Sequence, residues 1–214
     1  MTSVKRQYDS SRRQEQAQET RRRIIDAARD LFVDQGYGKT TIADVARSAG
    51  VAVETIYAAF KNKPTLLRQV WFAHFRGDED DVPLYDRAGM QAVLAETDLL
   101  KRTRKHAAFV TEVFRRIGPL QHALQGAAAS EPGAAAMLAE YAERRLDVAT
   151  NYARAAAATG QLAVSEDECR DVLFSTMDGA LWHSLVGERG WSDVRFATWL
   201  GEMWAAAFVE GARA

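Results

Sequence analysis

The sequence predicts an all-α fold in which a small N-terminal domain is followed by a larger helical domain. Three observations support this prediction. Apolar residues recur at intervals of three and four along most of the chain, and no stretch shows the alternation of a half-buried β-strand. The 214 residues include only four prolines. Hydrophobic residues make up 47% of the chain, which is enough to form a sizeable core.

The chain begins with a polar segment, residues 1–18, which we interpret as a basic arm ahead of the first helix. It is either a solvated tail or an extra contact to an anionic partner. A first helix is expected from about residue 19 to residue 35, and Gly36 is its expected end. Its apolar face consists of Ile24, Ile25, Ala28, Leu31 and Phe32. Arg21 to Arg23 lie in its first turn, where the helix dipole disfavours cations, so a nearby anionic partner would offset that cost.

Residues 41–63 have the pattern of two short helices joined by a tight turn. Thr41 and Asp44 have the spacing of a helix start, and Gly50 can adopt the left-handed conformation that ends a helix. A second helix is expected over residues 53–60. Two helices joined in this way form either an ordinary αα-hairpin or a helix-turn-helix, whose second helix enters the major groove of DNA.

Charge is distributed unevenly between the two parts of the chain. Residues 1–63 hold 12 of the 28 Lys and Arg residues but only 8 of the 29 Asp and Glu residues, so their net charge is +4. The net charge of residues 64–214 is −5. A basic domain joined to an acidic remainder is expected when only one domain faces phosphate.

One set of residues along this stretch carries a family resemblance: Thr41, Ala46, Ala49, Gly50, Val51, Ile56, Tyr57, Phe60, Lys63, Leu66 and Leu67. In these residues the chain resembles the TetR family of bacterial transcriptional repressors. The resemblance implies a three-helix DNA-binding domain over residues 19–64, which binds a palindromic operator in double-stranded DNA as a homodimer. It also implies a ligand-binding and dimerisation domain over residues 65–214, which responds to an unknown small-molecule effector.

The resemblance and the helical pattern together identify candidate DNA-contacting residues. The resemblance implies phosphate contacts from Thr40, Thr41, Tyr57 and Lys63. On the second helix of the motif, five side chains point away from the apolar side and would face the groove: Val53, Glu54, Thr55, Ala58 and Ala59. Only Thr55 and Glu54 of these can hydrogen-bond to a base edge. Ala52 and Ala59 depart from the family pattern, which leaves the operator sequence open.

The remainder of the chain is expected to be helical near residues 63–76, 88–100, 101–117, 119–129, 132–159, 165–186 and 192–211. Gly118 and Pro119 are expected to separate two of these helices. The segment 77–83 contains four carboxylates, but their spacing is not that of a calcium-binding loop, so no metal site is expected.

Two further surfaces are predicted in this helical part. Aromatic and methionine content identifies candidates for a ligand pocket, with core packing as the alternative: Phe109, Phe114, Tyr141, Tyr152, Met177 and Trp182. The last two helices have apolar faces wider than one core contact requires, which suggests a second partner surface. Since these helices form the dimer interface in the TetR family, we expect dimer contacts from Leu181, Leu185, Phe196, Leu200, Trp204 and Phe208.

Other classes of function are disfavoured. The spacings of the common catalytic, nucleotide-binding and di-iron motifs are missing, so neither an enzyme nor a cofactor is expected. Cys169 is the only cysteine, which excludes an intramolecular disulfide. No apolar run reaches the roughly 18 residues of a membrane span, and the N-terminus lacks the pattern of a secretory signal. We therefore expect no membrane association and a cytoplasmic location.

The expected function is a sequence-specific DNA-binding transcriptional regulator, in particular a repressor that a small hydrophobic or aromatic ligand releases from its operator. The alternative is a helical-bundle protein that binds a small molecule without reading DNA.

Overall fold

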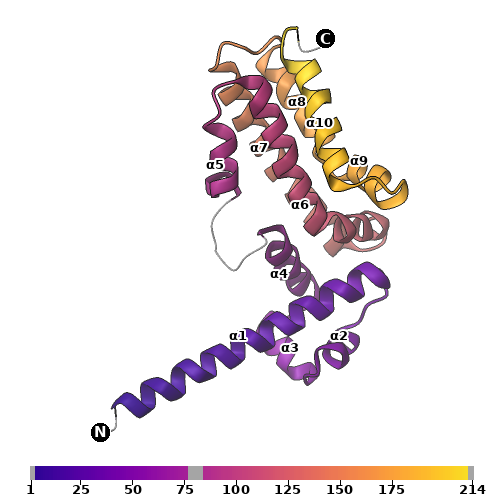
Figure 1. The fold of residues 1–214 in the computed structure, drawn as a ribbon. Helices are drawn as coiled ribbons and strands as arrows, with labels where there is room; N and C mark the ends of the chain where they lie inside the picture. The colour runs from indigo at the N-terminus through magenta and orange to yellow at the C-terminus, as the bar shows by residue number, and fades with distance from the viewer. Residues whose placement is uncertain (1–2, 77–83, 212–214) are drawn as a thin grey trace.

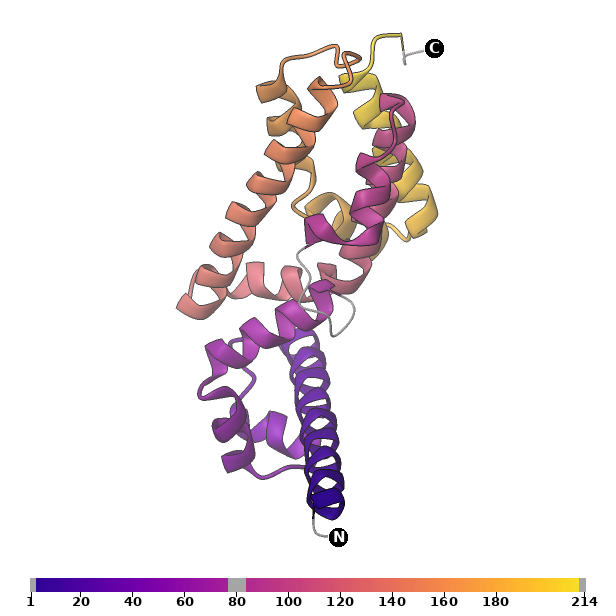
Figure 2. The same ribbon diagram turned by 90° about the vertical axis from the view of Figure 1, so that its left-hand side faces the viewer.

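The computed structural model describes residues 3–76 and 84–211. These residues form helices and the turns between them, with one isolated β-bridge between Leu162 and Val209 and no β-strand. The predicted all-α fold is confirmed. The molecule is elongated: the first helices form a head at the N-terminal end, and the remaining helices form a bundle at the other end, which we call the body (Figures 1 and 2).

The head consists of four helices: α1 (Ser3–Asp34), α2 (Ile42–Ala49), α3 (Val53–Phe60) and α4 (Lys63–Arg76). Helices α2 and α3 confirm the two short helices predicted from the motif. In contrast, α1 begins at Ser3, so residues 3–18 of the predicted arm are instead the first half of a helix that projects from the head (Figure 1). Residues 3–18 contain no Gly or Pro to end a helix. The apolar pattern could not reveal this half, because an exposed helix needs no apolar face.

The body contains the remaining elements: η1 (Leu84–Asp86), α5 (Ala88–Leu94), α6 (Leu99–Ala127), α7 (Pro132–Ala157), α8 (Glu166–Thr176), α9 (Ala180–Trp182), η2 (His183–Glu188) and α10 (Asp193–Phe208). Helix α10 packs along α6, and α7 packs along α8. The loop 77–83, for which we expect no metal site, lies outside the described residues.

The body differs from the prediction at two places. Helix α6 runs without a break through Gly118 and Pro119. Gly118 is required there because a Cβ atom would lie only 2.6 Å from the ring of Trp182. Conversely, the helix predicted over residues 165–186 is interrupted after Thr176, since Gly179 has a left-handed backbone with φ 82°. The chain then continues through the short α9 and the π-helical turn η2.

Head and body share a packed junction. The apolar core of the head includes Ile117 and Leu120 of α6 as well as Met137 and Tyr141 of α7. Helix α4 lies between the two parts (Figure 1), and its Arg68 forms an ion pair with Glu140 of α7. Movements of α4 relative to the body therefore require side chains of both parts to repack.

Candidate DNA-contacting surface and ligand cavity

Short-range hydrogen bonds define the helix-turn-helix. The Thr41 hydroxyl accepts a bond from the Asp44 backbone N–H at 3.1 Å, and the Asp44 carboxylate accepts one from the Thr41 N–H at 3.1 Å. The Thr41 hydroxyl also donates to the Asp44 carboxylate at 2.6 Å, and this bond and the one from the Thr41 N–H lower the pKa of the Asp44 carboxyl. Gly50, with φ 64°, ends α2, as expected for a residue without a Cβ atom. The turn thus places α3 against α2 with its apolar side inward.

One side of α3 is buried and the other faces solvent. Ile56 and Phe60 are each 1% exposed and pack into the head. The opposite side, which we call the recognition face, consists of Val53, Glu54, Thr55, Tyr57, Ala58 and Ala59, all exposed except the half-buried Val53. Tyr57 keeps 51% of its surface exposed, although it is a large aromatic residue. An exposed helix face of this kind fits the width of a DNA major groove.

The structure does not support the predicted phosphate contact of the Thr40 hydroxyl. Thr40 is only 1% exposed, and its hydroxyl lies 3.1 Å and 3.0 Å from the carbonyl oxygens of Leu31 and Gly36. A hydroxyl engaged inside the head cannot reach phosphate, so Thr40 holds the α1–α2 turn against the end of α1. The neighbouring Thr41 is exposed. Sequence alone cannot separate two adjacent threonines, because their chemistry is the same and only the fold differs.

Lys63 is the first residue of α4 and lies beside the α1–α2 turn. Its Nζ is 4.2 Å from the centre of the Tyr37 ring and donates to the carbonyl oxygen of Gly38 at 3.4 Å. Partial burial lowers the pKa of Lys63, and the nearby Glu131 carboxylate of α7 opposes that shift. Burial and Glu131 also raise the pKa of Tyr37 to about 12. The ammonium group is therefore positioned at the edge of the head, close to the N-terminus of a helix.

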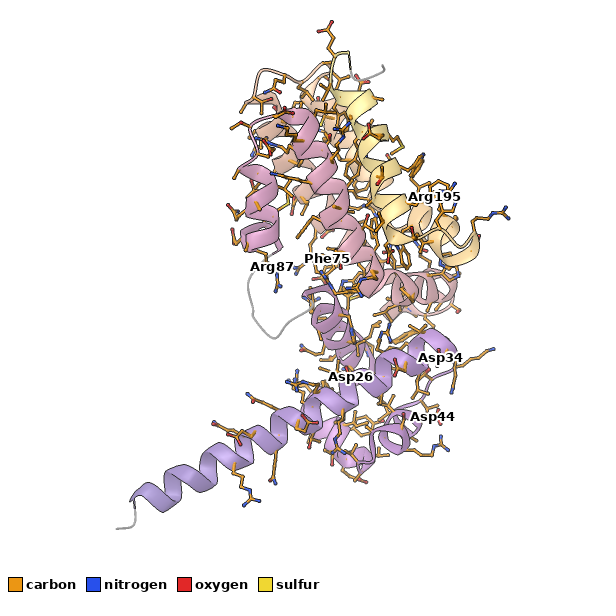
Figure 3. All side chains as sticks on the ribbon, viewed as in Figure 1. Asp26, Asp34, Asp44, Phe75, Arg87 and Arg195 are labelled. Carbon is orange, nitrogen blue, oxygen red and sulfur yellow. The ribbon has the colours of Figure 1, made fainter. Side chains whose placement is uncertain are left out.

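A cavity of about 240 Å³ lies in the body, next to the head; we call it the central cavity. Its wall comes mainly from α6 and α7, together with Phe75 of α4 and Tyr85 of η1. Phe75 lies where the end of α4 meets the body (Figure 3). Four of the six predicted pocket residues are on the wall: Phe109, Phe114, Tyr141 and Met177. Their role in binding a ligand stays a prediction.

The other two predicted pocket residues belong to the core instead. Tyr152 is fully buried and stacks on His106, with ring centres 4.3 Å apart and planes at 16°. The ring nitrogen of Trp182 donates to Asp193 at 2.9 Å, and its ring packs on Gly118. Sequence reasoning missed His106, which does line the cavity. The available signal was its position four residues before Val110, within the apolar stripe of α6.

The predicted dimer contacts also need correction. Phe196, Leu200, Trp204 and Phe208 are each 0% exposed, because α10 packs this side along α6 within the same chain. They are core residues and cannot form an interface. Leu181 and Leu185 remain partly exposed. On α10, three apolar side chains larger than alanine keep some exposed surface: Val194, Trp199 and Met203. A second partner surface on this helix stays a prediction, and Trp199 and Met203 are also partly packed against the core of the body.

The described part of the chain was also expected to lack a membrane span and a metal site. None of its helices has the length and apolar character needed to cross a membrane. No three metal-binding side chains come together among residues 3–76 and 84–211. Cys169 is buried, and burial raises the pKa of its thiol to about 12, which keeps it protonated.

Comparison with known sequences supports the interpretation of the head. Residues 24–70 match the sequence model described as bacterial regulatory proteins, tetR family. The transcriptional regulator AcrR of Shigella flexneri is 42% identical over 57 residues, which is 27% of this chain and 26% of AcrR. The regulator TtgR of Pseudomonas putida is 47% identical over 57 residues, or 27% of each chain. The alignment thus spans only about a quarter of the curated relatives.

Comparison with solved structures covers nearly the whole chain. NalD, a secondary repressor of a multidrug efflux pump in Pseudomonas aeruginosa, has a TM-score of 0.66 and 18% identity over 91% of this chain and 99% of its own. The SmeT–triclosan complex has a TM-score of 0.62 and 22% identity, covering 92% and 95%. Identities this low show a shared fold. The sequence of residues 24–70 is similar to the tetR family of bacterial regulatory proteins, and the fold of nearly the whole chain is similar to that of these solved structures.

Proposed function

We propose that the protein is a transcriptional repressor that binds a palindromic DNA site as a homodimer and is released by a small apolar or aromatic ligand. The observation that carries this proposal is the exposed recognition face of α3 on a basic head whose sequence matches DNA-binding regulators. Residues 19–64 of the head would bind DNA, and residues 65–214 would bind the ligand and the second subunit.

In the proposed complex, α3 lies in the major groove. Thr55 and Glu54 contact base edges, while Val53 and Ala58 contact thymine methyl groups. Thr41, Tyr57 and Lys63 contact phosphates, and Lys63 acts together with the positive end of α4. Base contacts select the sequence, whereas phosphate contacts hold the protein in register on any sequence.

Helix α4 offers a direct connection between ligand and DNA. It begins at Lys63, beside the proposed phosphate contacts, and Phe75 near its other end lies on the wall of the central cavity. The rings of Phe75 and Trp71 pack edge-on against Tyr141 of α7, with centres 6.0 Å and 5.1 Å apart. A ligand that changes the position of these rings would tilt α4. The ligand weakens DNA binding only to the extent that it binds the DNA-released conformation more tightly than the DNA-bound conformation.

The proposed dimer presents two recognition faces to half-sites one DNA turn apart, roughly 34–36 Å. We place the interface on the partly exposed apolar side chains of η2 and α10, in particular Leu185, Trp199 and Met203. Trp199→Glu would place a charge in this interface and yield monomers by light scattering. A mass of one chain for the unmodified protein would contradict the dimer itself.

DNA binding is tested by comparing three variants on a site selected from random duplexes. Lys63→Ala should weaken binding to the selected site and to random DNA alike, and reduce the salt slope by about one unit. Thr55→Ala should cost roughly 1 kcal/mol on the selected site and relax the preference at one base position. Lys101→Ala removes an exposed lysine of the body and serves as the charge control.

These results also separate the two candidate functions. If the unmodified protein selects no sequence and binds duplex DNA no better than Lys63→Ala does, the repressor assignment is wrong. A helical protein that binds a small molecule without reading DNA would then be the better description, provided that a ligand binds in the body.

A further inference from the structure

The central cavity has an unusual wall residue, His106 of α6. Its side chain is fully buried, and neither ring nitrogen has a hydrogen-bond partner among the described residues. Buried polar atoms in folded proteins are nearly always paired, so an unpaired imidazole next to a cavity calls for an explanation. Core packing alone does not provide one, because a phenylalanine would fill the same space without two polar atoms.

The surroundings of His106 hold its ring in one orientation. Tyr152 stacks on it at 4.3 Å, and the ring of Trp204 lies 5.2 Å away at a tilt of 34°. The Tyr152 hydroxyl is itself buried, and it has no hydrogen-bond partner within residues 3–76 and 84–211. The indole nitrogen of Trp204 is already bonded to Thr176 at 2.9 Å. The ring is thus packed by aromatic neighbours, while its two nitrogen atoms have no hydrogen-bond partner among the described residues.

The charge state of His106 limits what it can bind. Burial lowers its pKa to about 3, so the imidazole is neutral at physiological pH. A neutral imidazole offers one N–H donor and one acceptor nitrogen. A hydroxyl group can both donate and accept, so it matches either nitrogen. A carboxylate can only accept, and it would lose its hydration without gaining a cation at this place.

The charged residues of the cavity lie elsewhere on its wall, on α7. Arg144 and Asp147 are exposed, and Arg144 is already paired with Glu140 at 2.9 Å. Arg145 lies over the Phe174 ring at 4.4 Å. The rest of the wall consists largely of aromatic and aliphatic side chains, including Phe109. The Nε atom of Arg145 is buried and has no hydrogen-bond partner among the described residues. The cavity therefore combines an apolar body and a neutral polar point on α6 with charged side chains on α7.

We propose that His106 is the specificity-determining residue of the central cavity and that the cavity takes an uncharged aromatic compound whose hydroxyl group hydrogen-bonds to the His106 imidazole. This inference rests on the proposed ligand-controlled function and adds the chemical class of the ligand. At about 240 Å³, the cavity is slightly smaller than most ligand pockets, whose volumes start at about 300 Å³, and it suits a molecule of one or two rings.

The test compares three naphthalenes that differ in one substituent, by calorimetry with the full-length protein and without DNA. 2-Naphthol should bind one per chain and at least tenfold more tightly than 2-methylnaphthalene, which leaves the imidazole unpaired. It should also bind more tightly than 2-naphthoate, which carries a charge. Equal binding of naphthol and methylnaphthalene, tightest binding of naphthoate, or no binding of any of the three would each overturn the proposal.

Two variants assign the difference to one side chain. His106→Phe keeps an aromatic ring in place but removes both nitrogens, so it should bind naphthol and methylnaphthalene equally well. His122→Phe removes an exposed histidine of the same helix and should behave as the unmodified protein does. If His106→Phe weakens both compounds equally, His106 has only a structural role and the inference is wrong.

A spectroscopic measurement tests the contact without relying on the variant. In protein with 15N-labelled histidines, naphthol should shift the ring nitrogen signals of one of the four histidines, and methylnaphthalene should not. Operator binding is measured separately. If naphthol binds through His106 but leaves DNA binding unchanged, the inference holds while ligand-controlled repression fails.

Discussion

His106→Phe should change how the stability of the protein depends on pH. In the unfolded chain a histidine has a pKa near 6.5, whereas burial lowers the pKa of His106 to about 3 in the folded protein. Between these values the unfolded state binds a proton that the folded state does not. The stability linked to His106 is therefore fully present above pH 6.5 and is lost progressively as the pH falls toward 3.

The magnitude follows from the two pKa values. A pH of 5 lies about 1.5 units below the pKa of the imidazole in the unfolded chain. This difference lowers the free energy of unfolding by roughly 2 kcal/mol compared with neutral pH. All other titrating groups are common to the protein and the His106→Phe variant. The difference between the two pH profiles therefore isolates the histidine.

The assay is urea unfolding at pH 7 and pH 5 for both proteins, at one fixed protein concentration because subunit association also contributes to stability. The unmodified protein should lose about 2 kcal/mol more than the variant on acidification. Parallel losses in the two proteins would refute the reasoning. They would mean that His106 accepts a proton in the folded state, through water or a movement of the wall, and the cavity would then not select for a neutral ligand in the way we propose.

Three further predictions concern packing and capping. Gly118→Ala should lower the unfolding free energy by about 1–3 kcal/mol, because its Cβ would lie 2.6 Å from Trp182; thermal unfolding measures this, and the double change with Trp182→Leu should restore part of it. Trp204→Ala should lower the free energy of unfolding, measured with urea, by about 3–5 kcal/mol, while the oligomeric mass stays the same. A smaller oligomeric mass at unchanged stability would instead show that Trp204 lies in the dimer interface. Thr41→Ala should cost about 1 kcal/mol by removing the bond to the Asp44 N–H, and an unchanged melting temperature would show that this cap is dispensable.

Much of the head could be predicted because its signals are local. The cap at Thr41, the left-handed Gly50 and the apolar side of α3 all depend on residues within one or two turns of each other. Such interactions are encoded by spacing and can be recognised without the rest of the fold. The same holds for the caps at Ser165 and Ser192, whose hydroxyls accept the N–H bonds that begin α8 and α10.

The body was predicted less well, because its decisive contacts join residues far apart in the chain. The apolar pattern of α10 identified two sides but not which of them packs on α6, so Leu200 and Trp204 were assigned to the wrong surface. Similarly, Gly118 and Pro119 would end an isolated helix. In the structure the helix continues, and the ring of Trp182, 64 residues further along the chain, packs so close to Gly118 that only glycine fits there.

The candidate site shows the same division. The exposed residues of α3 follow from the helical period, and family resemblance gave their expected roles. Burial of Thr40 and the unpaired nitrogens of His106 have no counterpart in the sequence pattern. Both depend on where the α1–α2 turn and the aromatic rings around α6 come to lie. Period and capping therefore decided which residues form helices, and only the packing of those helices decided which polar groups remain available for a ligand.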